Sequence, residues 1–142
     1  MNMSDVNSTQ QRIAAQARAF KVAAVQMASG PNVAGNLGEA RHLIEMAVDH
    51  GARLVVLPEY FPIMGLSEMD KVAVREQPGS GVIQSFLRET ARKHKIWLVG
   101  GSIPLAASTP DKVLNTCLVF DETGAQVARY DKIHLFNLDL GN

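Results

Sequence analysis

The sequence has 142 residues, of which 46% are hydrophobic and 20% are charged, a composition that fits one globular domain. Basic and acidic residues both number 14, so the net charge of zero gives no electrostatic reason to expect nucleic acid or an anionic membrane as a partner. A single cysteine excludes an internal disulfide, and no Cys or His cluster suggests a metal site, which favours the cytoplasm. A small-molecule partner is the remaining expectation.

Residues 1–20 are rich in Ser, Gln, Asn and Ala and precede the first strand-like run. They predict a polar leader with a tendency to disorder, followed by one portion of a domain over residues 21–142. The leader has no apolar segment of the kind that directs secretion, and no run of about 18 apolar residues occurs in the chain. We therefore expect neither a signal peptide nor a membrane span.

Residues 21–27 (KVAAVQM) are an apolar run followed by a glycine and a proline, which predicts a buried strand that ends in a loop. Asn36 has the side chain of a helix cap, and apolar residues then recur every three or four positions until Gly51. This spacing predicts an amphipathic helix with Gly51 as its C-terminal stop.

Residues 53–57 (RLVVL) are continuous and rich in branched side chains, which predicts a strand buried on both faces. Pro58 closes this strand because proline cannot continue a hydrogen-bond ladder. Glu59 is therefore expected just past the carboxyl end of a strand. After a loop, residues 80–95 show helical spacing again and predict a second long helix.

The second half of the chain predicts three strands and one loop: strands over residues 96–100, 114–120 and 125–129, and a loop with two prolines over 102–112. Residues 121–124 (DETG) have turn chemistry, so the last two strands are expected to form a hairpin. Lys132 follows this hairpin. The element order implies an α/β fold, a mixed sheet covered by helices on one or both faces.

Glu59 and Lys132 hold positions from which side chains reach ligands in α/β proteins. The carboxyl ends of strands form the crevice where ligands bind, so a carboxylate and an amine there would face one pocket. Position alone favours the plainer interpretation, a loop carboxylate and a solvated surface amine.

Three segments carry more specific information: residues 21–27 with Asn36, Leu37 and Ala40, residues 51–61 (GARLVVLPEYF), and residues 115–136 (NTCLVFDETGAQVARYDKIHLF). In this order they resemble the opening strand and helix, the glutamate segment, and the hairpin with its lysine segment of the nitrilase superfamily of carbon-nitrogen hydrolases. The resemblance implies the N-terminal half of a four-layer α-β-β-α sandwich.

The resemblance also implies that Glu59 is the catalytic glutamate and Lys132 the catalytic lysine. In the implied chemistry a cysteine thiolate attacks an amide, nitrile or carbamoyl carbon, ammonia or an amine leaves, and water resolves the thioester. Glu59 would be the general base, tuned by partial burial, and Lys132 would stabilise the oxyanion. The resemblance implies no cofactor and no metal.

His134 lies two residues after Lys132 and on the same side of an extended segment. It either orients Lys132, contacts substrate or is a structural histidine, and the sequence leaves these alternatives open. Tyr60 and Phe61 either line a substrate pocket or pack in the core, which is the commoner role. The glycines at 100–101 either allow a close backbone approach or form an ordinary turn.

Cys117, the single cysteine, lies inside the expected strand 114–120 and ahead of the lysine, whereas the family's nucleophile follows the lysine in a strand-to-helix turn. We interpret Cys117 as a small buried hydrophobe. The nucleophile is therefore expected outside this chain, which we interpret as truncated before it and inactive alone. Asn137 stands where several subgroups have aspartate, so it favours no subgroup.

A half-sandwich would expose one apolar sheet face, and such a face favours association. We therefore expect a homo-oligomer or a complementing chain. The substrate is a small amide or, less in favour, a nitrile or carbamoyl compound. A noncatalytic half-domain that acts as a scaffold or interaction module is the alternative function. A nucleotide-binding domain is a third hypothesis, although the sequence has no glycine-rich phosphate-binding pattern.

Overall fold

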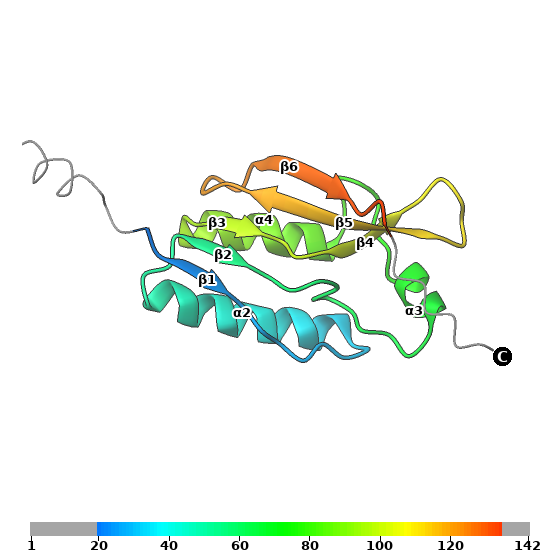
Figure 1. Cartoon of the computed structure of the whole chain (residues 1–142), viewed down its shortest axis with the longest axis horizontal. Helices are drawn as coiled ribbons and strands as arrows, with labels where there is room; N and C mark the ends of the chain where they lie inside the picture. Colours follow the sequence, from blue (N-terminus) through cyan, green and yellow to red (C-terminus); the bar gives the residue numbers. More distant parts are fainter. Residues whose placement is uncertain (1–19, 135–142) are drawn as a thin grey trace, which may run out of the picture.

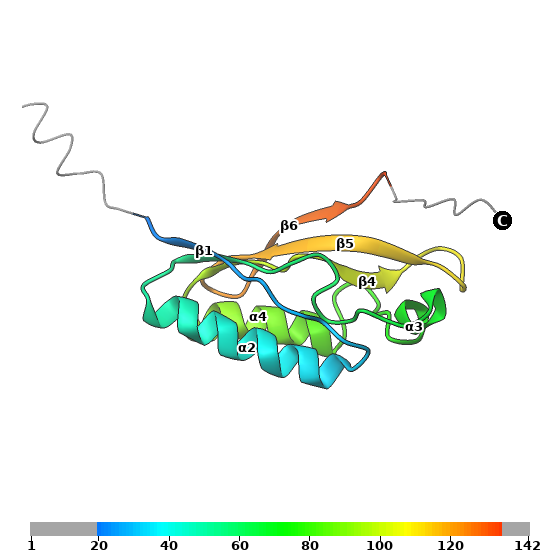
Figure 2. The same cartoon turned by 60° about the horizontal axis from the view of Figure 1, so that its bottom comes forward.

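The protein, seen in a computed structural model, is described over residues 20–134. Nearly all of the expected leader, and Asn137, lie outside this range. Helices α2 (Val33–Asp49) and α4 (Val82–His94) pack against one face of a six-stranded sheet, and the short helix α3 (Glu68–Ala73) lies at one end (Figures 1 and 2). The strands are β1 (Val22–Ala24), β2 (Leu54–Val56), β3 (Trp97–Val99), β4 (Ile103–Ala106), β5 (Val113–Phe120) and β6 (Gln126–Asp131).

The sheet is mixed, as the element order predicts. Strands β1, β2 and β3 are parallel, while β5 runs antiparallel to β3, β4 and β6. Strand β3 pairs with the end of β5 at Leu98↔Phe120, and β4 pairs with its start at Ile103↔Thr116. Among residues 20–134 the helices cover only one face of the sheet (Figure 2). Of the two arrangements expected from the sequence, helices on one face or on both, the structure shows the first.

The helix predicted after Asn36 is present as α2, but Asn36 is not its cap. Asn32 holds the cap position, where its side chain accepts a hydrogen bond from the Gly35 amide. Asn36 is buried inside the helix and its amide binds both backbone groups of Gly30 and the Pro62 carbonyl. The prediction was wrong because two asparagines lie one turn apart, and only tertiary contacts distinguish the cap from the residue that fastens two loops.

Strand β2 is not buried on both faces, which corrects the sequence prediction. Val55 is fully buried, whereas its neighbours Leu54 and Val56 are half-buried. Val55 pairs with Leu98 in β3, which is also fully buried, and both belong to the core under the helices. A continuous apolar run therefore serves here in a strand with one packed face and one open face.

The loop predicted over residues 102–112 contains strand β4, so that prediction was also wrong. Pro104 lies inside the strand, and its carbonyl accepts a hydrogen bond from the Glu76 amide on the side away from β5. Because the nitrogen and the carbonyl of a strand residue point to the same side, the missing N–H of Pro104 faces this edge and removes no bond to β5.

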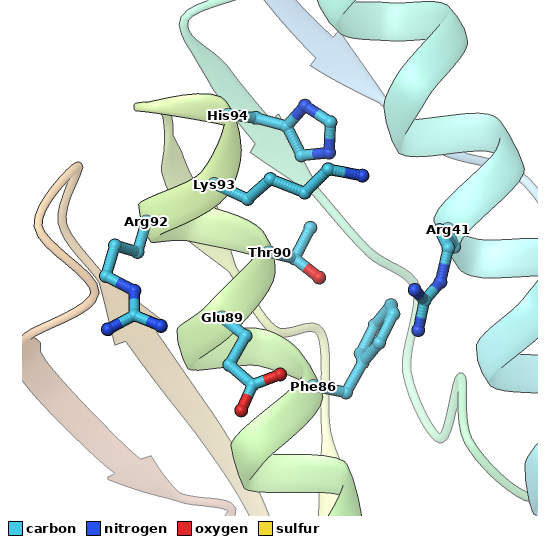
Figure 3. A pocket seen from close by; sticks show the side chains of 7 residues that line it. All are labelled: Arg41, Phe86, Glu89, Thr90, Arg92, Lys93 and His94. Atoms are coloured by element: carbon cyan, nitrogen blue, oxygen red, sulfur yellow. The ribbon is translucent and has the colours of Figure 1, made fainter.

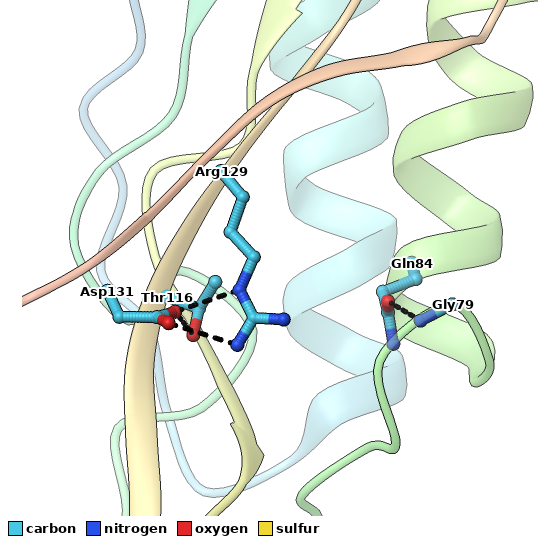
Figure 4. A network of polar contacts seen from close by, with 5 residues as sticks. All are labelled: Gly79, Gln84, Thr116, Arg129 and Asp131. Atoms are coloured by element: carbon cyan, nitrogen blue, oxygen red, sulfur yellow. Dashed lines mark hydrogen bonds and ion pairs between the residues drawn. The ribbon is translucent and has the colours of Figure 1, made fainter.

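Helix α4 confirms the prediction over residues 80–95, and its first turn is held by a buried carboxylate. Glu76 accepts hydrogen bonds from the amides of Ile83 and Gln84 at 2.5 and 3.0 Å. The Gln84 side chain accepts from the Gly79 amide at 2.8 Å, which fastens the preceding loop (Figure 4). The carboxylate thus satisfies amides that a helix start leaves without intrahelical partners.

The predicted hairpin joins β5 and β6. Asp121 accepts hydrogen bonds from the amides of Thr123 and Ala125, and Gly124 has a positive φ of 83°.

Helix α3 was not predicted from the sequence. At its start, Asp70 accepts hydrogen bonds from the amides of Leu66 and Ser67. No helix within residues 20–134 has the length and apolar character needed to cross a bilayer.

Candidate active site

Glu59 lies in the turn that follows β2, and a tight backbone contact fixes this turn. A Cβ at Gly101 would lie 2.0 Å from the Pro58 carbonyl oxygen, and Gly101 has a positive φ of 55°. Ser102 then bonds to both sides of Glu59: its amide donates to the Pro58 carbonyl at 3.4 Å, and its hydroxyl accepts from the Tyr60 amide at 2.9 Å. Of the two alternatives for the glycine pair, the close backbone approach is the one observed.

Lys132 reaches Glu59 from the other side of the site. It follows the last residue of β6, and its Nζ lies 2.8 Å from Glu59 Oε1. The exposed fractions are 34% for the Lys132 side chain and 56% for that of Glu59. The two residues are thus an ion pair, although their roles in catalysis stay a prediction.

Asn115 is the third member of this group. It lies in β5 and is 5% exposed, and its Nδ2 donates to Glu59 Oε1 at 2.7 Å. Its backbone carbonyl accepts the amide hydrogen of Lys132 at 2.9 Å. Sequence reasoning missed Asn115 as a site residue because a polar residue in a predicted strand carries no signal of a partner more than fifty positions away.

The surroundings of Glu59 favour its ionised form. Hydrogen bonds from Lys132 and Asn115 hold the pKa of the Glu59 carboxyl below its ordinary value, and the charge of Lys71 adds to this effect. Partial desolvation opposes it, with less weight. The expectation that partial burial tunes Glu59 as a base therefore does not describe this structure, because hydrogen bonding outweighs burial in setting the pKa of this largely exposed side chain.

Glu59 and Lys132 line one open depression of about 560 Å³. Val56, Val99 and Cys117 form its floor on the face of the sheet opposite the helices, since their strand neighbours, among them Leu98, are buried under the helices. The site is therefore an open, partly apolar hollow with a carboxylate and an ammonium at its edge.

Cys117 is half-buried in β5, which corrects the interpretation of a buried side chain, and it lines the same depression. Burial raises the pKa of its thiol, so the thiolate is less populated than that of an ordinary cysteine. This environment does not activate a nucleophile.

The other residues singled out in the sequence differ in their surroundings. His134 is exposed and lines the depression, so its orienting and substrate-contacting roles both stay open. Phe61 is fully buried against Phe86, with 6.3 Å between the ring centroids, so it packs in the core. Tyr60 is half-buried, and the Lys71 ammonium lies 4.5 Å from the centroid of its ring.

A polar network fixes the end of β6 immediately before Lys132. Asp131 accepts a hydrogen bond from the buried Thr116 hydroxyl at 2.7 Å and two bonds from the Arg129 guanidinium at 3.0 Å (Figure 4). Burial acts to raise the pKa of Asp131, but the bonds from Arg129 and Thr116 outweigh it and the pKa is lowered. The network ties the end of β6 to β5, at the residue immediately before Lys132.

A second cavity, of about 310 Å³, lies between α2 and α4 on the helical side of the sheet (Figure 3). The Arg41 guanidinium lies 5.6 Å from the centroid of the Phe86 ring, and Lys93 pairs with Glu45 at 3.0 Å. These contacts join the two helices. Neither Glu59 nor Lys132 lines this cavity.

Comparison with known proteins gives a family for this geometry. The profile of the family described as carbon-nitrogen hydrolase matches residues 21–141. The chain belongs to the carbon-nitrogen hydrolase family. The match covers the segments of Glu59 and Lys132, and it confirms the family that the sequence resembles.

Individual relatives of this carbon-nitrogen hydrolase agree with the profile. An omega-amidase of Danio rerio is 40% identical over 121 residues, which cover 85% of this chain and 42% of the relative. A deaminated glutathione amidase of Synechocystis is 35% identical over 85% of this chain and 44% of its own length. The solved structure of Nit3 from Saccharomyces cerevisiae, a member of the nitrilase superfamily, superimposes with a TM-score of 0.72 at 35% identity, over 81% of this chain and 44% of that one. This chain thus spans less than half the length of these relatives.

Proposed function

We propose that this chain contributes the general base and the oxyanion-stabilising cation of an amidase. The observation that carries the proposal is the 2.8 Å contact between Lys132 Nζ and Glu59 Oε1 at the edge of an open hollow. A carboxylate and an ammonium held together in this way can accept a proton and stabilise a developing negative charge within one site. Membership in the carbon-nitrogen hydrolase family supports this assignment.

The proposed reaction begins when a cysteine thiol gives its proton to Glu59 and its sulfur bonds to the amide carbon. Lys132 stabilises the negative charge that forms on the carbonyl oxygen. The proton then passes to the leaving nitrogen, the carbon-nitrogen bond breaks, and ammonia or an amine departs. Glu59 next removes a proton from water, which attacks the thioester and releases the acid and the thiol.

The state of Glu59 in this structure fits the start of the reaction but requires one further step. Its lowered pKa keeps it ionised, as a base must be, but also makes it a weak base. Its side chain is 56% exposed, so a polypeptide that covers the hollow would desolvate it and raise its basicity. We propose that the active form is covered in this way.

We propose that the nucleophile comes from that covering polypeptide and not from Cys117. The backbone of Cys117 is paired with Tyr130 inside the sheet, and burial raises the pKa of the thiol. A nucleophilic cysteine needs surroundings that favour the thiolate. The chain by itself is therefore expected to have no amidase activity.

The substrate class we propose is a small amide, ahead of a nitrile or a carbamoyl compound. The relatives with an activity in their names are an omega-amidase and a deaminated glutathione amidase, which both cleave amides. An open, partly apolar hollow with a cation at its edge accommodates a short acyl chain.

The single cysteine, which lacks a disulfide partner, is compatible with a cytoplasmic location.

Ammonia release from small amides tests the proposal. The chain alone should release none, and the active form, this chain with the polypeptide that supplies the cysteine, should lose activity on Glu59→Gln or Lys132→Ala but keep it on Cys117→Ala. Amide hydrolysis by the chain alone that Cys117→Ala abolishes would overturn the assignment.

A noncatalytic interaction module is the second candidate, and the open sheet face favours it. Val22 is 64% exposed and Trp97 is 38% exposed on strands β1 and β3, and both are large apolar residues. Exposed apolar surface of this kind marks a docking face for a second copy or a complementing chain. In sedimentation experiments the chain should associate and Trp97→Lys should weaken association; a strictly monomeric wild-type chain would count against this candidate.

A further inference from the structure

We propose that Asn115 is a positioning residue for the Glu59–Lys132 pair, which directs both hydrogen bonds onto one carboxylate oxygen and leaves the other oxygen to carry the proton. This inference rests on the proposed function, because it assigns a task to a residue beside the proposed base. It makes Asn115 a residue that acts through Glu59 and not one that touches the reacting atoms.

Two contacts give Asn115 this position. Its side-chain amide donates to Glu59 Oε1 at 2.7 Å, and its backbone carbonyl accepts the Lys132 amide hydrogen at 2.9 Å. The same residue thus fixes the side chain of the proposed base and the main chain of the proposed cation. Asn115 is itself held in β5 opposite Pro104 and is only 5% exposed, so its own movement is restricted.

The orientation of the Asn115 amide has only one favourable choice. With Nδ2 toward the carboxylate, Oδ1 is buried and has no hydrogen-bond partner among residues 20–134. The opposite orientation would place Oδ1 against the Glu59 carboxylate, where two acceptors repel each other. An amide that leaves its own oxygen unsatisfied in order to aim its donor at Glu59 is costly for folding alone, which points to a task at the site.

The contacts of Glu59 are unequal between its two oxygens. Lys132 and Asn115 both donate to Oε1, at 2.8 and 2.7 Å, whereas no hydrogen bond from residues 20–134 ends on Oε2. Two donors, one of them charged, lower the proton affinity of the oxygen they contact. Proton transfer is therefore assigned to Oε2. Without Asn115, the carboxylate could rotate and Lys132 could contact either oxygen.

The test follows the titration of the Glu59 carboxyl carbon by NMR in the 142-residue chain, with assignment by Glu59→Gln. Asn115→Ala removes the donor, so the Glu59 midpoint should move to higher pH. Asn115→Asp keeps the shape but introduces a second carboxylate, so the midpoint should move up and two coupled titrations should appear. The matched control is Gln84→Ala, which removes another buried amide that has no contact with Glu59 and should leave the midpoint unchanged.

An unchanged Glu59 midpoint in both Asn115 variants would overturn the inference and leave Asn115 as a structural strand residue. If Asn115→Ala does not fold, the isosteric Asn115→Asp variant decides the matter alone. These measurements need no hydrolysis, so they are independent of the proposed function. Shifted midpoints together with an active Glu59→Gln enzyme would leave the positioning role intact and remove the catalytic one.

Discussion

Lys132 Nζ lies 2.8 Å from Glu59 Oε1, although the two residues are 73 positions apart in the chain. The contact joins the end of the β5–β6 hairpin to the turn after β2. Both of these segments are fixed by independent interactions, Lys132 by the Asp131 network and Glu59 by Ser102. The two backbone segments that carry the pair are therefore fixed by interactions other than the ion pair itself.

The ion pair should contribute little to stability but set the ionisation of Glu59. Lys132→Met removes the largest cause of the lowered Glu59 pKa, so this pKa should rise. The folded-state pKa is below the unfolded value, so the pair's stabilisation is present above the unfolded pKa and is lost as pH falls through the folded one. Because both side chains are substantially exposed, it should be at most about 1 kcal/mol.

Urea unfolding of wild-type protein and Lys132→Met at about pH 7 and about pH 3 checks this sign. The difference in the free energy of unfolding should be present near neutrality and smaller in acid, because the lowered folded-state pKa of Glu59 delays its protonation. A difference that is equal at both pH values would show that Lys132 acts through packing and not through its charge.

Gly101→Ala should be strongly destabilising, by about 2 kcal/mol or more. The new methyl group would lie 2.0 Å from the Pro58 carbonyl, and a positive φ of 55° is unfavourable for alanine. Gly38→Ala is the matched control, because this helical glycine has no atom within 4 Å of the new Cβ and alanine favours the helix. Thermal unfolding should show a lower Tm for Gly101→Ala and a higher Tm for Gly38→Ala than for wild type. Equal changes in Tm would contradict the close approach of Gly101 to Pro58.

Ser102→Ala should cost about 1 to 3 kcal/mol, because the Tyr60 amide would lose its acceptor in a partly buried turn. The turn that carries Glu59 would also gain freedom, so the active form should lose kcat more than it changes KM. Ser85→Ala, in helix α4, is the control and should be neutral or slightly stabilising. A Ser102→Ala variant as stable and active as wild type would contradict a role of this serine in fixing the turn that carries Glu59.

Glu76→Ala should destabilise the fold by about 2 kcal/mol or more, since the amides of Ile83 and Gln84 would lose a buried acceptor at the start of α4. In the Glu76→Ala variant, amide hydrogen exchange should increase most, relative to wild type, in the first turn of α4. Glu45→Ala removes a surface carboxylate that pairs with Lys93, so it should change stability much less than Glu76→Ala. Similar losses in both variants would contradict the capping role of Glu76.

The elements that the sequence predicts well are those with a local signal. Helix α4 has regular apolar spacing, and the turn at 121–124 has Asp and Gly at positions where their backbone preferences matter. Strand β4 was missed because Pro104 is unfavourable in most strands and only the position of its nitrogen at an edge permits it.

The site shows the same division between local and long-range information. Glu59 and Lys132 follow strand ends that can be located from sequence, and the family resemblance predicts that both are catalytic. Asn115 and Ser102 have no local signal, because their importance comes from contacts with residues more than forty positions away. The exposure of Glu59 was also unpredictable, since it depends on which segments pack around the turn after β2.

The rate of amide hydrolysis by the Glu59→Gln variant of the active form tests the central claim most directly. Glu45→Gln is the matched control, because Glu45 also forms a contact with a lysine, at 3.0 Å, but lies on the helical side of the sheet. If Glu59 is the general base, its variant should lose kcat/KM by at least about 100-fold while Glu45→Gln keeps the wild-type value. Equal kcat/KM for the two variants would contradict the assignment of Glu59 as the base.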